Sequence, residues 1–226
     1  MTAVYGYVAD RVIRTETELK QFKEEHPDYR FNGIEPQLGQ IVYKDMDGPG
    51  GTPDGIVDKY DISILKKSNN PVVLGLTLGA EWKGLAVAAT FNGNLKYYRW
   101  MKDLAGGTEW NRMWVNWYGD SWTPDNTNAS LPKRLHAYDG SATYHDDSSF
   151  WLKRGDFLRL KNLNLSYTIP QKIYRSIGLD KVSVYFVGTN LFVLSGFNKN
   201  YYDPEMKEGF TFPIMKSYNF GVNVSF

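Results

Sequence analysis

The sequence predicts an all-β fold of antiparallel strands that cross a membrane as part of a β-barrel, with long extracellular loops and one short N-terminal helix. Three observations predict it. The last nine residues alternate apolar and small polar side chains up to Phe226. Two earlier stretches, which follow residue 71, alternate over about ten residues each, the length that a tilted strand needs to cross a bilayer. Residues 101–156 then form one long connection, which is unusual in a compact domain and ordinary between barrel strands.

The C-terminal segment shows the alternation most clearly. Large apolar side chains stand at every second position, namely Tyr218, Phe220, Val222, Val224 and Phe226. Small polar residues or glycine fill the positions between them. Because successive side chains on a strand point to opposite faces, this strand has one apolar and one polar face. A barrel strand needs this arrangement, since lipid covers one face and the lumen the other.

The remaining elements divide the chain into two predicted regions. Residues 1–70 are expected to be rich in loops, with one helix over residues 15–26 that Thr15 or Thr17 caps. Residues 71–226 are expected to hold the barrel strands. The first two form a hairpin around Lys83-Gly84. The later strands are predicted over residues 157–168, 181–193 and 218–226, with a short helix-like segment over 171–177.

Composition excludes several classes of function. The net charge is +1, so no overall field favours nucleic acid as a partner. Cysteine is absent, which excludes disulfides, thiol catalysis and cysteine-based zinc sites. Histidines at ligand spacing, a phosphate-binding loop and an oriented carboxylate pair are also missing. We therefore expect that the chain is not an enzyme. Residues 1–7 lack the basic and apolar regions of a signal peptide, and none is expected there.

An acidic loop follows the predicted helix and resembles a calcium-binding loop. Its candidate ligands are Asp45, Asp47, Asp54, Ile56 (through its carbonyl), Asp58 and Asp61. The second half fits the spacing of an EF-hand loop, but residues 48–53 form an insertion and Asp61 is shorter than the usual glutamate. Calcium is therefore a possible cofactor. The alternative is a metal-free turn in which aspartate side chains bind backbone N–H groups.

Two further sets of residues are candidates for contacts in the lumen or at its mouth. Trp110, Trp114 and Trp117 could stack on sugar rings of a ligand, pack the long loop onto itself, or lie in the membrane interface. Arg159 and Lys161 are expected on one face of their strand, toward the lumen or the interface. The carboxylates of Asp203 and Glu205 are expected to belong to a structural turn.

Several segments resemble, in order and spacing, the C-terminal barrel region of SusC/RagA-type TonB-dependent outer-membrane transporters of the Bacteroidetes. These segments are residues 39–45, Trp122-Thr-Pro-Asp-Asn-Thr-Asn-Ala129, Phe157-Leu-Arg-Leu-Lys-Asn-Leu163, Tyr167-Thr-Ile-Pro170, Gly188-Thr-Asn-Leu-Phe192, Tyr202-Asp-Pro-Glu205 and the terminal strand. Together they cover nearly the whole chain. The resemblance implies the last strands of a barrel of about 22 strands with a plugged lumen.

The resemblance also implies a function and partners. It implies import of oligosaccharides, peptides or other large nutrients across the outer membrane as part of a longer protein. The implied partners are a SusD-like surface lipoprotein, the TonB-ExbB-ExbD complex and outer-membrane lipid. It further implies that Phe220, Val222, Val224 and Phe226 form the signal read by the barrel-assembly machinery. The alternative from another class is a secreted, calcium-containing carbohydrate-binding β-sandwich module.

Overall fold

The computed structural model describes residues 3–67, 70–101, 120–133, 147–197, 202–206, 212 and 214–226. The chain divides into two compact units, which are described separately below. Unit 1 holds residues 1–69 and 98–153, and unit 2 holds residues 70–97 and 154–226. The described residues of 98–153 thus group with the N-terminal segment. The expected division into residues 1–70 and 71–226 stays a prediction. In the described part of the chain, no helix is long and apolar enough to cross a membrane.

Unit 1 is built from one helix and short paired strands. Helix α1 covers Glu16–Glu25, and a 3-10 turn, η1, covers Lys59–Asp61. Strand β1 (Val4–Gly6) pairs with β6 (Ser63–Lys66), and β2 (Ala9–Val12) pairs with β4 (Ile41–Tyr43), both antiparallel. Strand β3 (Arg30–Phe31) pairs with β5 (Ile56–Val57) in parallel. Strand β9 (Tyr98–Trp100) pairs with β10 (Leu152–Arg154).

Thr15 caps helix α1 and is one of the two caps that the sequence predicts. The Thr15 side chain accepts a hydrogen bond from the Glu18 backbone N–H, and the Glu18 carboxylate accepts one from the Thr15 N–H. This reciprocal pair satisfies donors that have no partner inside the helix. Phe22 lies on the buried side of the helix, and its ring packs edge-to-face on Tyr29 with centroids 5.0 Å apart. The helix is therefore fixed by its cap and by one buried aromatic residue.

An aromatic cluster forms the core of unit 1. The rings of Tyr7, Phe31 and Tyr43 lie within 5.4 Å of one another, centroid to centroid, and all three are buried. They come from β3, β4 and the segment between β1 and β2, so burial of the three rings joins strands that are each too short to be stable alone.

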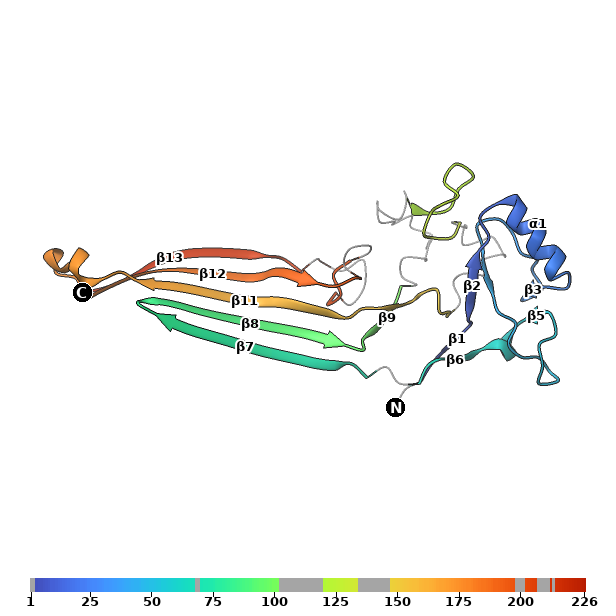
Figure 1. Cartoon of the computed structure of the whole chain (residues 1–226), viewed down its shortest axis with the longest axis horizontal. Coiled ribbons are helices and arrows are strands. Elements are labelled where there is room, and N and C mark those ends of the chain that lie inside the picture. Colours follow the sequence, from blue (N-terminus) through green and yellow to red (C-terminus); the bar gives the residue numbers. More distant parts are fainter. Residues whose placement is uncertain are drawn as a thin grey trace. The chain divides into compact units, whose positions relative to one another are not determined.

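Unit 2 contains an antiparallel sheet of five strands in the order β13-β12-β11-β8-β7, which lie side by side in Figure 1. The strands are β7 (Val72–Trp82), β8 (Leu85–Leu95), β11 (Phe157–Thr168), β12 (Lys181–Leu194) and β13 (Ser217–Ser225). Two short 3-10 turns, η2 (Gln171–Ile173) and η3 (Arg175–Ile177), connect β11 to β12. These bounds agree closely with the predicted strands and with the predicted helix-like segment.

A two-residue turn joins β7 to β8. Lys83 and Gly84 both have positive φ, at 46° and 87°, as a tight hairpin turn requires. At the other end of the sheet, the strands are connected by residues 96–156 and 195–216. The sheet therefore has short connections at one end and long ones at the other, the asymmetry of outer-membrane barrels, whose short turns are periplasmic and long loops extracellular.

Candidate functional site

The register of the sheet gives it one apolar face. Large apolar residues align across the strands in rows, which include Trp82-Leu85-Tyr167-Val184-Val222 and Ala80-Val87-Leu165-Phe186-Phe220. Many of these side chains are exposed, among them Leu76 at 54%, Trp82 at 69% and Phe220 at 79%. A protein surrounded by water seldom exposes an apolar surface of this extent, and a lipid-facing surface is apolar throughout.

The opposite face of the sheet, called the polar face below, carries small or polar residues. Its rows include Thr77-Thr90-Asn162-Thr189-Ser217 and Gly79-Ala88-Asn164-Val187-Asn219. The hydroxyl groups of Thr77 and Thr90 lie 3.2 Å apart, and those of Thr189 and Ser217 lie 2.6 Å apart, so cross-strand pairs bind each other. An apolar outer face and a polar inner face are what the wall of a transmembrane barrel requires.

The predicted assembly residues lie on the apolar face of the outermost strand. Phe220, Val222 and Val224 face Phe186, Val184 and Val182 of β12. Phe226 follows the end of β13 and is 94% exposed. Within the described residues, β13 and β7 each pair with a neighbour on one side only. Unpaired strand edges cannot lie in hydrocarbon, so this sheet needs further strands at both edges in order to span a membrane.

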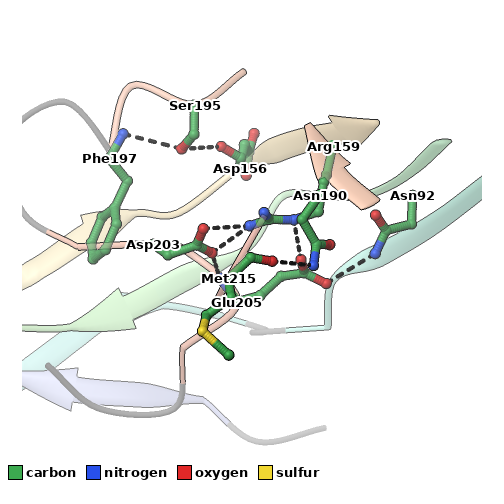
Figure 2. A network of polar contacts seen from close by, with 9 residues as sticks. All are labelled: Asn92, Asp156, Arg159, Asn190, Ser195, Phe197, Asp203, Glu205 and Met215. Atoms are coloured by element: carbon green, nitrogen blue, oxygen red, sulfur yellow. Dashed lines mark hydrogen bonds and ion pairs between the residues drawn. The ribbon is translucent and has the colours of Figure 1, made fainter. Parts of the chain in front are cut away.

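A charged cluster lies on the polar face near the long connections, and Figure 2 shows it. Arg159 of β11 is 2% exposed and forms ion pairs with Asp203 and Glu205 of the β12–β13 connection. The Glu205 carboxylate also accepts a hydrogen bond of 2.9 Å from the Asn92 side-chain amide on β8. The sequence placed Arg159 toward the lumen or the interface. The structure shows it on the polar face, because it pairs across the sheet with Asn92.

The same connection is held at two more points. The Asn190 side chain donates a hydrogen bond of 2.9 Å to the Met215 carbonyl, and the Ser195 hydroxyl donates one of 2.8 Å to the Asp156 carbonyl. Asn190 has a φ of 51°, and the register of β12 against β11 shifts beside it. A β-bulge therefore re-aims this side chain toward the connection. Neither contact was predicted from the sequence. An asparagine tolerates positive φ better than most residues, so Asn190 itself is the sequence feature that fits a bulge at this position.

The acidic loop uses its aspartates to bind backbone N–H groups. Asp61 is 1% exposed and accepts hydrogen bonds from Met46 (2.6 Å), Asp47 (3.1 Å) and Asp58 (2.8 Å). Asp45 accepts one of 2.6 Å from Gly55. Asp47, Asp54 and Asp58 each accept one from the backbone within two residues. These are the bonds expected of a metal-free turn. Ile56 lies in β5 and its side chain is exposed.

The carboxylate of Asp45 is the group in this loop whose environment is relevant to cation binding. Burial raises the pKa of Asp45, and the negative charges of Asp61 and Asp54 raise it further, against the lowering effect of the Gly55 N–H. The Asp45 Oδ1 atom is buried without a hydrogen-bond partner. No group of three or more histidine, cysteine or acidic side chains is gathered for a metal ion within the part of the chain that the structure describes. Calcium binding to this loop stays a prediction.

The predicted ligand contacts cannot be placed. Trp110, Trp114 and Trp117 lie outside the described residues, so their roles stay predictions.

The sheet and its two faces define a class: a segment of an outer-membrane β-barrel. No protein-family profile matches the chain. Two curated proteins of Formosa agariphila are similar to it: TonB-dependent receptor P26, 25% identical over 214 residues that cover 85% of this chain and 20% of the receptor, and TonB-dependent receptor P3, 22% identical over 205 residues that cover 83% and 19%. The chain thus spans about a fifth of the length of these relatives.

Solved structures show the same fold. The RagAB peptide transporter matches 100% of this chain, over 23% of its own chain, with a TM-score of 0.62 and 20% identity. The RagAB peptide importer in the "closed-closed" state matches 99% of this chain, over 23% of its own, with a TM-score of 0.61 and 21% identity. The predicted fold class and the resemblance to SusC/RagA-type TonB-dependent outer-membrane transporters are therefore confirmed, and so is the outer-membrane location.

Proposed function

We propose that this chain forms the C-terminal barrel strands of a longer TonB-dependent importer. The observation that carries the proposal is the five-stranded sheet with one exposed apolar face and strands of 9 to 14 residues. Strands of this length cross a bilayer when tilted, and an apolar face of this kind needs lipid to cover it. The alternative, a secreted carbohydrate-binding β-sandwich, requires a second sheet packed on the apolar face. Apart from this sheet, the sheets formed by the described residues have only two strands each.

The proposal includes the cargo and partners of the longer protein. The relatives named above are receptors and peptide transporters rather than enzymes, which supports transport as the activity. Import of peptides or oligosaccharides, a SusD-like surface lipoprotein and energy from TonB-ExbB-ExbD follow from the family resemblance. The polar cluster around Arg159 lies at the end of the sheet with long connections. In the proposed barrel this end is extracellular, and the cluster holds a long connection against the lumen side of the wall there.

The experiment compares two substitutions on one strand of the full-length protein. Leu76→Arg places a charge on the apolar face, and Thr77→Arg places the same charge on the polar face one residue later. A lipid-facing arginine at the bilayer midplane destabilises a barrel by about 2–4 kcal/mol, and a lumen-facing one leaves it assembled. We expect Leu76→Arg to deplete the heat-modifiable barrel from outer membranes and Thr77→Arg to leave it there.

The same cells report on import. Those that carry Thr77→Arg should retain TonB-dependent uptake of a fluorescent peptide or oligosaccharide mixture, and those that carry Leu76→Arg should lose it. Equal effects of the two substitutions on assembly would contradict a lipid-facing sheet. Uptake that continues in the absence of TonB would contradict the energy source.

A further inference from the structure

A shallow groove of about 230 Å³ lies on the apolar face, close to the end of the sheet with the short turns. Two neighbouring cross-strand rows form its walls. Leu85, Tyr167 and Val184 belong to one row, and Leu165, Phe186 and Phe220 belong to the next. The groove is apolar and open along the apolar face of the sheet. Its chemistry suits one hydrocarbon chain.

A lysine is held at the turn end of this groove. The Thr168 N–H donates a hydrogen bond of 2.8 Å to the Gly84 carbonyl, and a Cβ atom built on Gly84 would lie 3.7 Å from the Tyr167 ring. The Lys83-Gly84 turn therefore lies beside one wall of the groove. The Lys83 ammonium lies 4.8 Å from the centroid of the Trp82 ring, and Trp82 belongs to the apolar face. This contact keeps the charge on the lipid side of the sheet.

The charges around the turn favour an anion. Four cations lie in residues 79–86 and 166–183, namely Lys83, Lys172, Arg175 and Lys181. The acids in the same segments are Glu81 and Asp180. Glu81 pairs with Ala86 and Lys181 pairs with Ser225, so both belong to the polar face, away from the groove. On the apolar side of the β7–β8 turn, Lys83 is thus without a neighbouring carboxylate on its own hairpin.

The position of the groove along the strands indicates which class of lipid it would meet. Short turns of outer-membrane barrels are periplasmic, so this end of the sheet meets the inner leaflet, which consists of phospholipid. A phospholipid carries a hydrocarbon chain next to a phosphate, which matches an apolar groove next to a turn that carries a cation. We propose that an anionic phospholipid of the inner leaflet binds here, with an acyl chain in the groove and its phosphate at the Lys83 ammonium. This inference rests on the proposed function, because it requires the apolar face to lie in the membrane.

Native mass spectrometry of the full-length barrel in mild detergent tests the proposal, with phosphatidylglycerol added as the probe. Lys83→Gln removes the charge at the mouth of the groove, and Leu165→Trp fills the groove. Lys59→Gln is the matched control, because the Lys59 ammonium lies 5.0 Å from the centroid of the Tyr60 ring and so forms the same kind of pair on a residue of unit 1.

We expect one phosphatidylglycerol to remain bound to the unmodified barrel. Lys83→Gln should lower its occupancy about fivefold, the factor for one cation near anionic lipid. Leu165→Trp should remove it, and Lys59→Gln should change nothing. Heat-modifiable migration of each variant shows whether the barrel has assembled. Assembled barrels in which Lys83→Gln and Lys59→Gln retain lipid equally would overturn this inference and leave the proposed function intact. A dimer in place of the lipid-bound barrel would also overturn it.

Discussion

Arg159 on β11 and Asp203 in the β12–β13 connection form an ion pair in which one guanidinium nitrogen contacts both carboxylate oxygens. The two residues are 44 positions apart in the sequence. Glu205 contacts the same guanidinium, so one buried cation holds two carboxylates against the polar face of the sheet. The contact attaches a long connection to the barrel wall, and it does so at the point where β8, β11 and the connection meet.

The first prediction concerns this ion pair. Arg159→Met keeps an unbranched apolar side chain but leaves Asp203 and Glu205 side by side without their cation. Breaking a buried pair in this way costs about 3 kcal/mol or more. We expect faster hydrogen exchange at residues 202–206 and cleavage of the β12–β13 connection at lower protease concentrations.

Arg154→Met is the matched control for Arg159→Met. Arg154 also pairs with an aspartate, Asp156, but its side chain is 70% exposed. An exposed pair contributes about 1 kcal/mol or less, so exchange at residues 202–206 should be unchanged. Equal effects of the two substitutions would show that Arg159 does not hold the connection.

The long strands could be predicted because their signals are local. Alternation from Val72 to Trp82 and a Lys-Gly turn are enough to specify the β7–β8 hairpin. The partners of Arg159 could not be predicted in the same way. The sequence placed Arg159 on one face of a strand, but its contacts depend on how a connection 44 positions away folds back. Asp203 and Glu205 were predicted only as a structural turn, and the turn does contain the hydrogen bond from Glu205 N–H to Asp203 Oδ1.

Unit 1 was predicted less completely. Its strands are two to four residues long, too short for alternation to be visible, and they are specified by burial of Tyr7, Phe31 and Tyr43 against one another. The acidic loop was recognised from its spacing. Which carboxylate is buried could not be read from that spacing, since Asp61 is buried by the backbone N–H groups of residues 46 and 47, which the fold brings to it.

The second prediction is a loss of stability of unit 1 at alkaline pH. Burial raises the pKa of Tyr29 from 10.0 to about 12, although the Tyr43 N–H that donates to its phenol oxygen acts in the opposite direction. In the unfolded chain the phenol ionises near its ordinary value. The stabilisation is therefore complete below pH 10 and is lost as pH rises toward 12, by about 2–3 kcal/mol in total. Hydrogen exchange in unit 1, divided by the intrinsic exchange rate at each pH, should accelerate over this range.

Tyr29→Phe provides the comparison for the alkaline transition. This variant loses the acceptor of the Tyr43 N–H, so unit 1 should be less stable by about 1–3 kcal/mol at neutral pH. The part of the stability loss between pH 10 and 12 that comes from ionisation of Tyr29 should be absent in this variant. A decline of the same size in Tyr29→Phe would assign the alkaline effect to another group.

The third prediction concerns Asp61. Asp61→Asn retains the shape of the side chain but replaces one acceptor oxygen with a donor, which then faces a backbone N–H. Because Asp61 is buried and accepts three such bonds, we expect a loss of about 2–3 kcal/mol and faster exchange at Met46, Asp47 and Asp58. Asp54→Asn is the control, because Asp54 accepts only one exposed bond, from the Ile56 N–H, which an asparagine oxygen can still accept. No change is expected at those three amides.

The fourth prediction separates the two hypotheses for the acidic loop. Calcium titrated into the full-length protein in detergent should give a saturable heat if the loop binds the ion, and Asp54→Ala should remove that heat. A bound cation would also satisfy Asp45 Oδ1 and lower the raised pKa of that carboxyl, so the apparent affinity should fall at acid pH. Identical heats in the two proteins, or none, would leave the metal-free turn as the account of this loop.

The fifth prediction concerns Phe226, which follows β13 and is 94% exposed. If its ring is read by the barrel-assembly machinery, deletion of Phe226 should reduce the heat-modifiable barrel in outer membranes several-fold. The folded sheet should be barely affected, because the side chain is almost fully exposed. Phe212→Ala is the matched control, since Phe212 is 87% exposed but lies outside the strands. Normal assembly without Phe226 would show that the signal lies elsewhere on β13, with Phe220, Val222 and Val224 as the remaining candidates.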